Sequence, residues 1–506
     1  MDNTIQLYLD KEKQIKGYPI TSPDRVVDEN GVNIKDEIEE INSSLDNIAI
    51  YPHKIESETN YTNAFYRAIN TIKEKGKGTI HLGQGKVYKG NIHINTENVT
   101  ISGGGVLQGK IIIGEEVGEP KELNFNIDNV TIDNIDSCIE LVNVRDGKIQ
   151  NCTFKNGYKA IHVKPVNTTH QQHVNKIIID KNKFYNNSYC LYADKHTEFT
   201  QVFTTGDIHF TNNQAYNTKI THIHLLGIDG IIISNNTLFF PGYQLKDINK
   251  KHNIYADYCT WVIINSNNLF ESGEDGIVLR HFQNANITNN NIVWSGQSKI
   301  SNAITLIDGD TANNIYNISS ISSNNIIFPT KHGIEIGNIG QLNVDNNLIK
   351  FAGYEGYYYG VDNINSITHY AILNSSNNPV YIKNNVSIDN LNSFTDKTIH
   401  FNNVDTKNNI NNKSTRVLTL NTLDGAIDSS YWDFINLAQP SPKTISNIVN
   451  GYDGKEITFF SYNSNTTIEF NDSIRLKDGI NCNMPNLATL TLVFMGGRWF
   501  EKSRSF

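Results

Sequence analysis

The sequence predicts an all-β fold whose body is a single-stranded, right-handed parallel β-helix. A recurring apolar-x-apolar segment and an offset column of asparagine pairs indicate stacked coils, and no period of 3.6 residues survives between residues 90 and 390. At 506 residues the chain exceeds the usual size of one domain unless a structural unit repeats. The repeat is therefore the first feature to establish.

The repeated strand segment recurs at the spacing of one coil. Successive copies lie 22 to 32 residues apart, and YAIL from Tyr370 extends the series. Branched apolar side chains at alternate positions suit the interior of stacked parallel strands. We expect about ten coils. Their interior column consists of Ile139, Ile161, Leu191, Ile223, Ile254, Ile277, Ile304 and Ile334.

The asparagine pairs are expected to form a corner of each coil. Asparagine tolerates the left-handed backbone that a sharp corner needs, and stacked asparagine side chains can hydrogen-bond along the axis. The spacings of a leucine-rich horseshoe or a propeller are not seen. The pairs are Asn235-Asn236, Asn267-Asn268, Asn290-Asn291, Asn324-Asn325, Asn346-Asn347 and Asn384-Asn385.

Residues 1–50 are expected to form an attachment segment with a short helical stem. Apolar residues at heptad spacing run from Ile34 to Ile48, and mostly isoleucine at both seam positions favours a three-stranded coiled coil. A lone amphipathic helix packed on its own chain is the alternative. The segment therefore predicts a trimer without excluding a single-chain role for this helix.

The β-helix is expected over residues 51–405 and a C-terminal β-sandwich over residues 406–506. A first helix with Phe65, Ala68 and Ile72 on one face would cap the open end of the solenoid. After the last asparagine pairs, alternating segments such as TLTLVF indicate strands of a sandwich.

Charge and cysteine usage exclude several classes of partner. The net charge is −9 and no long Lys/Arg cluster occurs, which argues against nucleic acid and anionic membrane. The N-terminus lacks the pattern of a signal peptide, and no stretch reaches the length of a membrane span. The five cysteines lack C-x-x-C spacing and are expected to be buried thiols. No cofactor is expected.

Three segments resemble bacteriophage tailspike and tail-fibre proteins with a pectate-lyase-like body. YPITSPDRVVDENGVNIKDEIEE looks like the attachment segment of tail proteins from phages of low-GC Gram-positive bacteria. ETNYTNAFYRAINTIKEKGKGTIHLGQGKVY looks like the entry motif of the pectate-lyase-like superfamily, with Gln84 where proline is usual. TLTLVFMGGRWFEKSR looks like the closing strand of tailspike C-terminal sandwiches.

The resemblance implies a homotrimeric virion component, assembled in the host cytoplasm, that binds a host surface polysaccharide, capsule or teichoic acid. Many such proteins cleave this polymer, whereas others only bind it. Residues 1–50 would then contact baseplate or tail proteins. Because the family's catalytic carboxylates have no fixed motif positions, the candidates must come from the geometry of this sequence.

Strand alternation locates a candidate site. The first and third residues of each repeated strand point inward, so the second and fourth face solvent and stack at about 4.8 Å per coil. The second-position column is Glu140, His162, Tyr192, His224, Tyr255, Val278, Thr305 and Glu335. Its neighbour is Val142, Lys164, Asp194, Leu226, Asp257, Arg280, Ile307 and Gly337. One patch thus combines Tyr192, His224, Tyr255, Asp194, Asp257 and Arg280.

This patch has the chemistry of a glycan site. Tyrosine faces can pack on sugar C–H groups, His224 and Arg280 can donate hydrogen bonds, and carboxylates can act as acid and base. Asp194 and Asp257 lie two coils, about 9.6 Å, apart, so their side chains can reach the spacing of an inverting hydrolase. For each residue singly, an ordinary solvated position on an exposed sheet is the alternative.

The corner before the GIVL strand is a second catalytic candidate. Glu271, Glu274 and Asp275 crowd there beside Arg280 and His281, and like charges can raise one carboxyl pKa. A plain Asp-Gly turn is the alternative.

Two further segments are considered as binding sites, one for substrate and one for a metal ion. GYEGYYYGVDN places Tyr357 and Tyr358 among four tyrosines of one loop, where they would bind substrate or pack between subunits. Asp308 and Asp310 lack the spacing of an EF-hand calcium loop, so no metal site is expected.

Three functions remain open: a phage glycan depolymerase, a non-catalytic receptor-binding spike, and a cellular polysaccharide lyase or hydrolase. A secreted cellular enzyme would normally need an export signal. The two groups of carboxylates favour the depolymerase. Hydrolase and lyase chemistry are not distinguished by the sequence.

Overall fold

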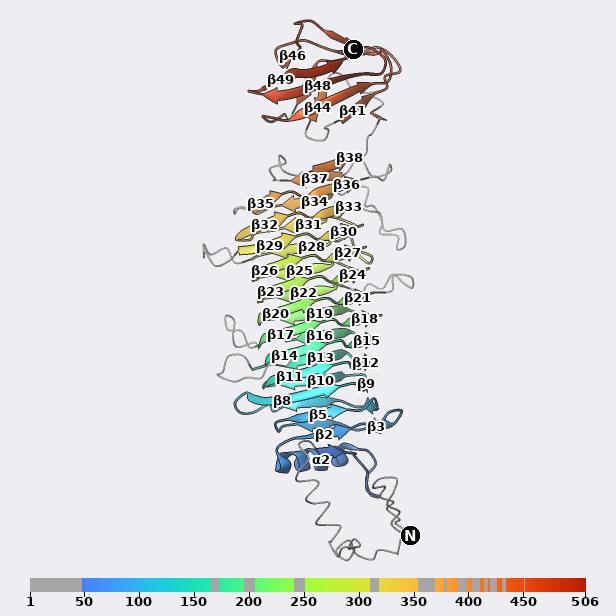
Figure 1. Ribbon diagram of the computed structural model, residues 1–506, viewed down its shortest axis with the longest axis vertical. Coiled ribbons are helices and arrows are strands. Elements are labelled where there is room, and N and C mark those ends of the chain that lie inside the picture. The colour runs from blue at the N-terminus through green and yellow to red at the C-terminus, as the bar shows by residue number, and fades with distance from the viewer. Residues whose placement is uncertain are drawn as a thin grey trace, which may run out of the picture.

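The computed structural model shows a long parallel β-helix followed by a smaller C-terminal β-structure (Figure 1). The described residues are 48–164, 173–194, 205–240, 251–309, 318–353, 369–376, 380–389, 398–402, 410–413, 417–418, 426–429, 434–449 and 451–506. The predicted seam from Ile34 lies outside them, apart from Ile48 at its end.

Sheet 1 of the helix has 13 parallel strands. They are β1 (Ile48–Ile50), β2 (Gly78–His81), β5 (Val99–Ser102), β8 (Lys121–Asp128), β11 (Val144–Gln150), β14 (Asn175–Asp180), β17 (Thr205–Thr211), β20 (Ile228–Ser234), β23 (Thr260–Asn265), β26 (Gln283–Thr288), β29 (Ile318–Ser322), β32 (Gln341–Asp345) and β35 (Val380–Lys383).

Sheet 2 has 12 parallel strands and carries the predicted repeat. They are β4 (Ile92–Ile94), β7 (Ile111–Gly114), β10 (Ser137–Val142), β13 (Lys159–Lys164), β16 (Tyr189–Ala193), β19 (Thr221–Leu226), β22 (Ile254–Asp257), β25 (Ile277–Arg280), β28 (Ile304–Ile307), β31 (Ile334–Ile336), β34 (His369–Asn374) and β37 (Thr398–Asn402).

Sheet 3 has 13 short parallel strands. They are β3 (Val87–Lys89), β6 (Val106–Gln108), β9 (Thr131–Asp133), β12 (Thr153–Lys155), β15 (Lys183–Tyr185), β18 (Gln214–Tyr216), β21 (Thr237–Phe239), β24 (Asn268–Phe270), β27 (Asn291–Val293), β30 (Asn325–Ile327), β33 (Leu348–Lys350), β36 (Val386–Asp389) and β38 (Ile410–Lys413). The chain visits sheets 1, 3 and 2 in turn, and each visit to all three completes one coil.

The predicted interior column is confirmed. Ile139 pairs with Ile161, and the register continues without a slip through Ile254 to Ile334. Ile254 is fully buried, as are its column neighbours. The described strands stack slightly more coils than the ten expected, because the N-terminal coils before Ile139 carry less regular repeats.

The asparagine ladder is also confirmed. The Asn236 amide N–H and side chain both donate to Asn267 Oδ1, at 3.0 and 2.9 Å, and Asn267 does the same to Asn290. The preceding corner residue is left-handed, with φ of 57° at Asn235. Asparagine is thus used both for its backbone tolerance and for its side-chain hydrogen bonds.

Helix α2 (Thr62–Lys75) covers the first coils, as the sequence predicted. Phe65, Ala68 and Ile72 are buried on one face against β2 and β4. The helix ends at Gly76, whose φ of 81° is the left-handed conformation common at helix C-termini.

The C-terminal strands form one mixed sheet and two smaller sheets around their own core. The mixed sheet contains β39 (Val417–Leu418), β41 (Phe434–Leu437), β44 (Glu456–Ser461), β46 (Ile474–Arg475), β48 (Ala488–Met495) and β49 (Arg498–Ser505). The smaller sheets pair β40 (Ala426–Asp428) with β43 (Asn447–Val449), and β42 (Lys443–Ile445) with β45 (Thr466–Ile468) and β47 (Cys482–Met484). Trp499 is fully buried here, and its Nε1–H donates to the Ile448 carbonyl at 3.0 Å.

The cysteine prediction is confirmed, because all five thiols are buried and unpaired. Within the described ranges, no helix has the length and apolar character needed to cross a membrane.

Candidate functional site

The predicted outward column lies on sheet 2 with the expected register, but His162, Val278 and Thr305 are buried where solvent exposure was expected. His162 pairs with Tyr192, Tyr192 with His224, and His224 with Tyr255. Next to it, Leu226 pairs with Asp257 and Asp257 with Arg280. The alternation works because flat parallel strands place every second side chain on one face.

The rings of this column stack on one another. The centroids of Tyr192 and His224 are 4.9 Å apart with planes 6° from parallel, and those of His224 and Tyr255 are 5.0 Å apart at 13°. Tyr189 packs edge-on against Tyr192 at 4.8 Å. The coil rise brings the rings into contact, so each covers its neighbour's face. The patch therefore presents hydroxyl groups and imidazole edges to solvent. Little free tyrosine face remains for sugars to pack on, contrary to the expectation from the sequence.

Both ends of the stacked column are also covered. The Lys159 ammonium lies 4.0 Å from the centroid of the Tyr192 ring. At the other end the His252 ring lies 5.5 Å from that of Tyr255. Burial lowers the pKa of His224 to about 4, so this imidazole is neutral at neutral pH and can both donate and accept a hydrogen bond.

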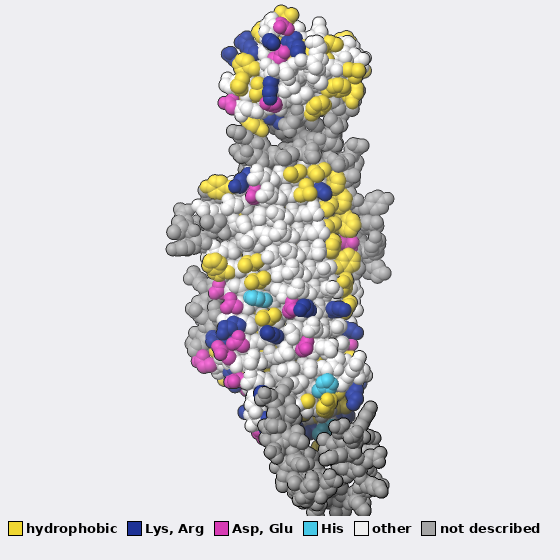
Figure 2. Space-filling view, in the orientation of Figure 1, with side chains coloured by type: hydrophobic (Ala, Val, Ile, Leu, Met, Phe, Trp, Pro, Cys, Tyr) yellow, Lys and Arg dark blue, Asp and Glu magenta, His cyan; other side chains and the backbone are white. Residues whose placement is uncertain are grey.

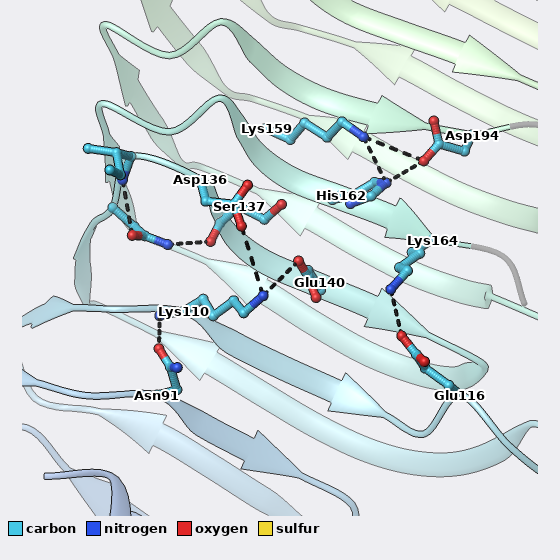
Figure 3. Close-up of polar contacts among 12 residues, drawn as sticks. Asn91, Lys110, Glu116, Asp136, Ser137, Glu140, Lys159, His162, Lys164 and Asp194 are labelled. Carbon is cyan, nitrogen blue, oxygen red and sulfur yellow. Dashed lines mark hydrogen bonds and ion pairs between the residues drawn. The ribbon is translucent and has the colours of Figure 1, made fainter.

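Asp194 is held by two basic side chains. Its Oδ2 lies 2.6 Å from His162 Nε2 and 3.5 Å from Lys159 Nζ, and these groups converge at one end of the patch (Figure 3). Burial alone would raise the pKa of Asp194, but the hydrogen bond from His162 and the charge of Lys159 outweigh it and lower the pKa. Asp194 is therefore an ionised base or nucleophile, not a proton donor.

Asp257 belongs to a separate cluster. Its Oδ1 lies 2.7 Å from His281 Nδ1, and the Tyr255 hydroxyl donates to its Oδ2 at 3.4 Å. The Tyr258 ring stacks on His281 at 4.3 Å, and Asp308 lies 4.0 Å from His281 Nε2. Asp194 and Asp257 thus each have an imidazole partner. Asp194 follows β16 and Asp257 ends β22, and these two strands flank β19.

The corner candidates form a third cluster. Glu274 Oε2 lies 3.5 Å from His252 Nε2, and Asp275 Oδ2 lies 3.9 Å from His252 Nδ1. The pKa of Asp275 is raised to about 6, chiefly by burial and secondarily by the charges of Glu274 and Glu335. The expected like-charge effect is present, but burial is the larger cause. Glu271 takes the left-handed position of this corner, with φ of 54°.

Asp275 also belongs to a polar ladder inside the corner. The Asn302 N–H donates to Asp275 Oδ1 at 2.6 Å, and the His332 N–H donates to Asn302 Oδ1 at 3.1 Å. The Tyr370 N–H then donates to His332 Nδ1 at 3.0 Å. Asp275 therefore supports the coil corner whether or not it also acts on a substrate.

Several residues of the site were not singled out from the sequence. Lys159 and Tyr189 pair with each other three positions before His162 and Tyr192, so strict alternation would have placed them on the inward face and missed them. His162 stood in the predicted column without an assigned role. His281 occupies a left-handed turn position, with φ of 43°, which alternation does not reach. The loop residues Tyr357 and Tyr358, and also Asp310, lie outside the described residues.

Comparison with known proteins adds similarity of fold. Neither a protein-family model nor a curated protein matches the sequence. ORF18 of Geobacillus virus E2 gives a TM-score of 0.40 at 13% identity, over 72% of this chain and 65% of that chain. The match thus spans slightly less than two thirds of ORF18.

Two further solved structures are similar at the same level. A mutant tailspike protein of E. coli bacteriophage HK620, in complex with a pentasaccharide, gives a TM-score of 0.40 at 12% identity, over 86% of this chain and 82% of that chain. An alginate lyase from Paenibacillus sp. str. FPU-7 gives 0.37 at 13% identity, over 58% and 95%. The β-helix assignment itself rests on the three long parallel sheets.

Proposed function

We propose that the protein is a bacteriophage tail spike that recognises and depolymerises a host cell-surface polysaccharide, which is a capsule, an exopolysaccharide or a wall teichoic acid. The row of ring edges and carboxylates along sheet 2 is the observation that carries this proposal. It follows the helix axis from β13 to β25, so it suits an extended polymer better than a small molecule. The spike assignment is supported by the three sequence segments that resemble tail proteins.

The side chains support acid–base cleavage of a glycan. The hydroxyl and imidazole edges of Tyr192, His224 and Tyr255 can hydrogen-bond sugar hydroxyls. Arg280 can bind a carboxylate or phosphate of the polymer. Asp194, kept ionised by His162, is the proposed base, and Asp257 is the proposed second carboxylate.

The assembly is part of the same proposal. We infer a homotrimer in the virion, attached to baseplate or tail proteins through residues 1–50, with no nucleic acid or membrane as partner. This part is supported by the resemblance of the N-terminal segment and by the heptad seam that ends at Ile48.

The full chain should be incubated with host capsule and wall polymers while new reducing ends and unsaturated uronate absorbance are followed. Wild-type protein is expected to produce new reducing ends, alone if it hydrolyses the glycan and together with unsaturated uronate absorbance if it acts by elimination. Asp194→Asn and Asp257→Asn should each lower the rate by about 100-fold or more while binding persists. Glu140→Gln is the matched control, because it lies in the same outward column, paired with Lys110 at 3.1 Å, outside the patch.

Two outcomes would redirect the proposal. If both asparagine variants stay active while Glu274→Gln or Asp275→Asn abolishes activity, the reaction takes place at the corner cluster. If none of the four matters, yet Tyr192→Ala or Arg280→Ala weakens adsorption to host cells, the protein is a binding spike without chemistry. The imidazole partners already present on Asp194 and Asp257 are the observation that favours this second function.

A further inference from the structure

The outward face of sheet 3 carries an apolar column. The third residues of successive strands from β15 to β30 pair in register and are half-buried. The five strands from β18 to β30 hold no charged residue, whereas Lys155 precedes the column and Lys350 follows it. Figure 2 shows hydrophobic side chains as a band along this margin of the helix. The column consists of Tyr185, Tyr216, Phe239, Phe270, Val293 and Ile327.

Three aromatic residues extend this column at the neighbouring corner. Trp294, Phe328 and Phe351 follow β27, β30 and β33 and have φ of 58°, 57° and 57°. In three earlier coils the same corner position, directly after the sheet 3 strand, is left-handed and occupied by asparagine, at Asn156, Asn186 and Asn217, and after β24 it is occupied by Glu271. A left-handed backbone costs a bulky residue about 1–2 kcal/mol. The later coils therefore use a costlier residue type where the fold itself accepts asparagine.

These three rings stack in order, so both faces of Phe328 and one face each of Trp294 and Phe351 are covered. Trp294 and Phe328 have centroids 6.1 Å apart with planes 11° from parallel, and Phe328 and Phe351 lie 4.9 Å apart at 12°. Trp294 is 38% exposed. A sugar ring packs on a free aromatic face, and the stacking leaves Phe328 none. A continuous apolar surface without charge fits a protein surface better.

We propose that this apolar stripe, defined as the six-residue column together with Trp294, Phe328 and Phe351, packs against a second copy of this chain with parallel axes. The column repeats once per coil over about 24 Å, at about 4.8 Å per step. A partner that follows such a repeat must have the same rise, which another copy of this helix has along its whole length. Closed symmetry about an axis parallel to the helix brings equal coils to the same level.

The predicted seam from Ile34 to Ile48 favours the same parallel orientation of chains. The stripe lies on sheet 3, whereas the proposed glycan site lies on sheet 2. The inference rests on the assembly that the proposed function includes, and it is independent of whether the protein cleaves a polymer.

The test measures the mass of the full chain by sedimentation velocity and light scattering at decreasing concentration. The triple variant Trp294→Asn, Phe328→Asn and Phe351→Asn restores the residue that earlier coils use, so it should fold. We expect its dissociation constant to rise at least about tenfold relative to wild type. Trp261→Asn is the matched control, because Trp261 is 59% exposed with φ of 48° but lies on sheet 1.

A second variant tests the column itself, separately from the three corner aromatic residues. Ile327→Lys introduces a lysine into the column, and Lys350 already occupies the paired position one coil later. A monomer should therefore tolerate the substitution, whereas an interface would have to desolvate the added charge. A monomeric wild type, or wild-type dissociation in both variants, overturns the inference. A triple variant that keeps its mass but no longer binds host polysaccharide also overturns it, and identifies the stripe as a glycan surface.

Discussion

At the scale of single residues, the three clusters of the site hold their ionisable groups in different states. Asp194 is kept ionised, His224 is kept neutral, and Asp275 has a pKa raised to about 6. The first two states suit a polymer site at neutral pH, because they leave one base and one neutral donor–acceptor. The raised pKa of Asp275 means that ionising this carboxylate at neutral pH costs folding free energy. Such groups are common at functional sites.

The cost at Asp275 leads to a prediction about stability. Its folded pKa lies above the unfolded value, so its contribution to stability is fully present below about pH 3.8 and is lost as the pH rises through about 6. At pH 7 to 8 the wild type should therefore carry a penalty of up to about 3 kcal/mol that Asp275→Asn removes. Asparagine keeps an oxygen that can accept from the Asn302 N–H.

Thermal unfolding of both proteins across pH checks this prediction. The variant should be the more stable protein at pH 7 to 8, and the difference should shrink toward zero near pH 4. Glu97→Gln, at an exposed position away from this corner, is the control. A variant that is less stable than wild type at pH 8 would show that the hydrogen bond to Asn302 outweighs the burial of charge.

At the scale of elements, the asparagine ladder is what joins one coil corner to the next. Asn267 Oδ1 accepts both donors of Asn236, and its side-chain amide donates to the Ile233 carbonyl and to Asn290, each at 2.9 Å. Asn267→Ala would leave buried donors and an acceptor unpaired, at a cost of about 3 kcal/mol. Chemical denaturation should show this loss, whereas Asn268→Ala, at an exposed position beside it, should change stability by less than about 0.5 kcal/mol.

The interior column provides a more severe test of the coil register. Ile254 and Ile277 are fully buried and pair with each other. An aspartate at either position would place an unpaired charge between coils, so Ile254→Asp or Ile277→Asp should prevent folding into soluble protein. Soluble expression with wild-type circular dichroism would mean that the side chain does not point inward.

Features that follow from strand alternation could be predicted from the sequence, whereas features that depend on local turns and side-chain rotation could not. The column from Ile139 to Ile334 could be predicted, because stacked strands repeat one hydrophobic alternation and a slip would expose every inward residue. The contacts of Asp194 and Asp257 could not. They depend on the left-handed turn at His281 and on ring rotation at His162, which alternation does not specify. The pairing of Tyr192 with His224 implied that their rings lie close together. That the rings cover each other's faces is seen only in the structure.

At the scale of the whole molecule, the helix places the two proposed binding surfaces on different sheets. Sheet 2 carries the polar and aromatic row proposed to bind a polymer, and sheet 3 carries the apolar stripe proposed to contact other copies. Both run along the long axis (Figure 1). A parallel assembly joined through sheet 3 leaves sheet 2 available over its length, so binding and assembly can be tested separately.

Removal of residues 1–50 should therefore leave both properties in place. The deletion takes away the predicted heptad seam and strand β1, which pairs only at the first edge of sheet 1 with β2. Light scattering of the truncated chain is expected to show the same number of copies as the intact protein, and polysaccharide binding should be unchanged. Virion attachment should be lost. If the truncated chain is a monomer at micromolar concentration while the triple stripe variant of the intact chain stays assembled, the seam alone holds the copies together and sheet 3 has no part in assembly.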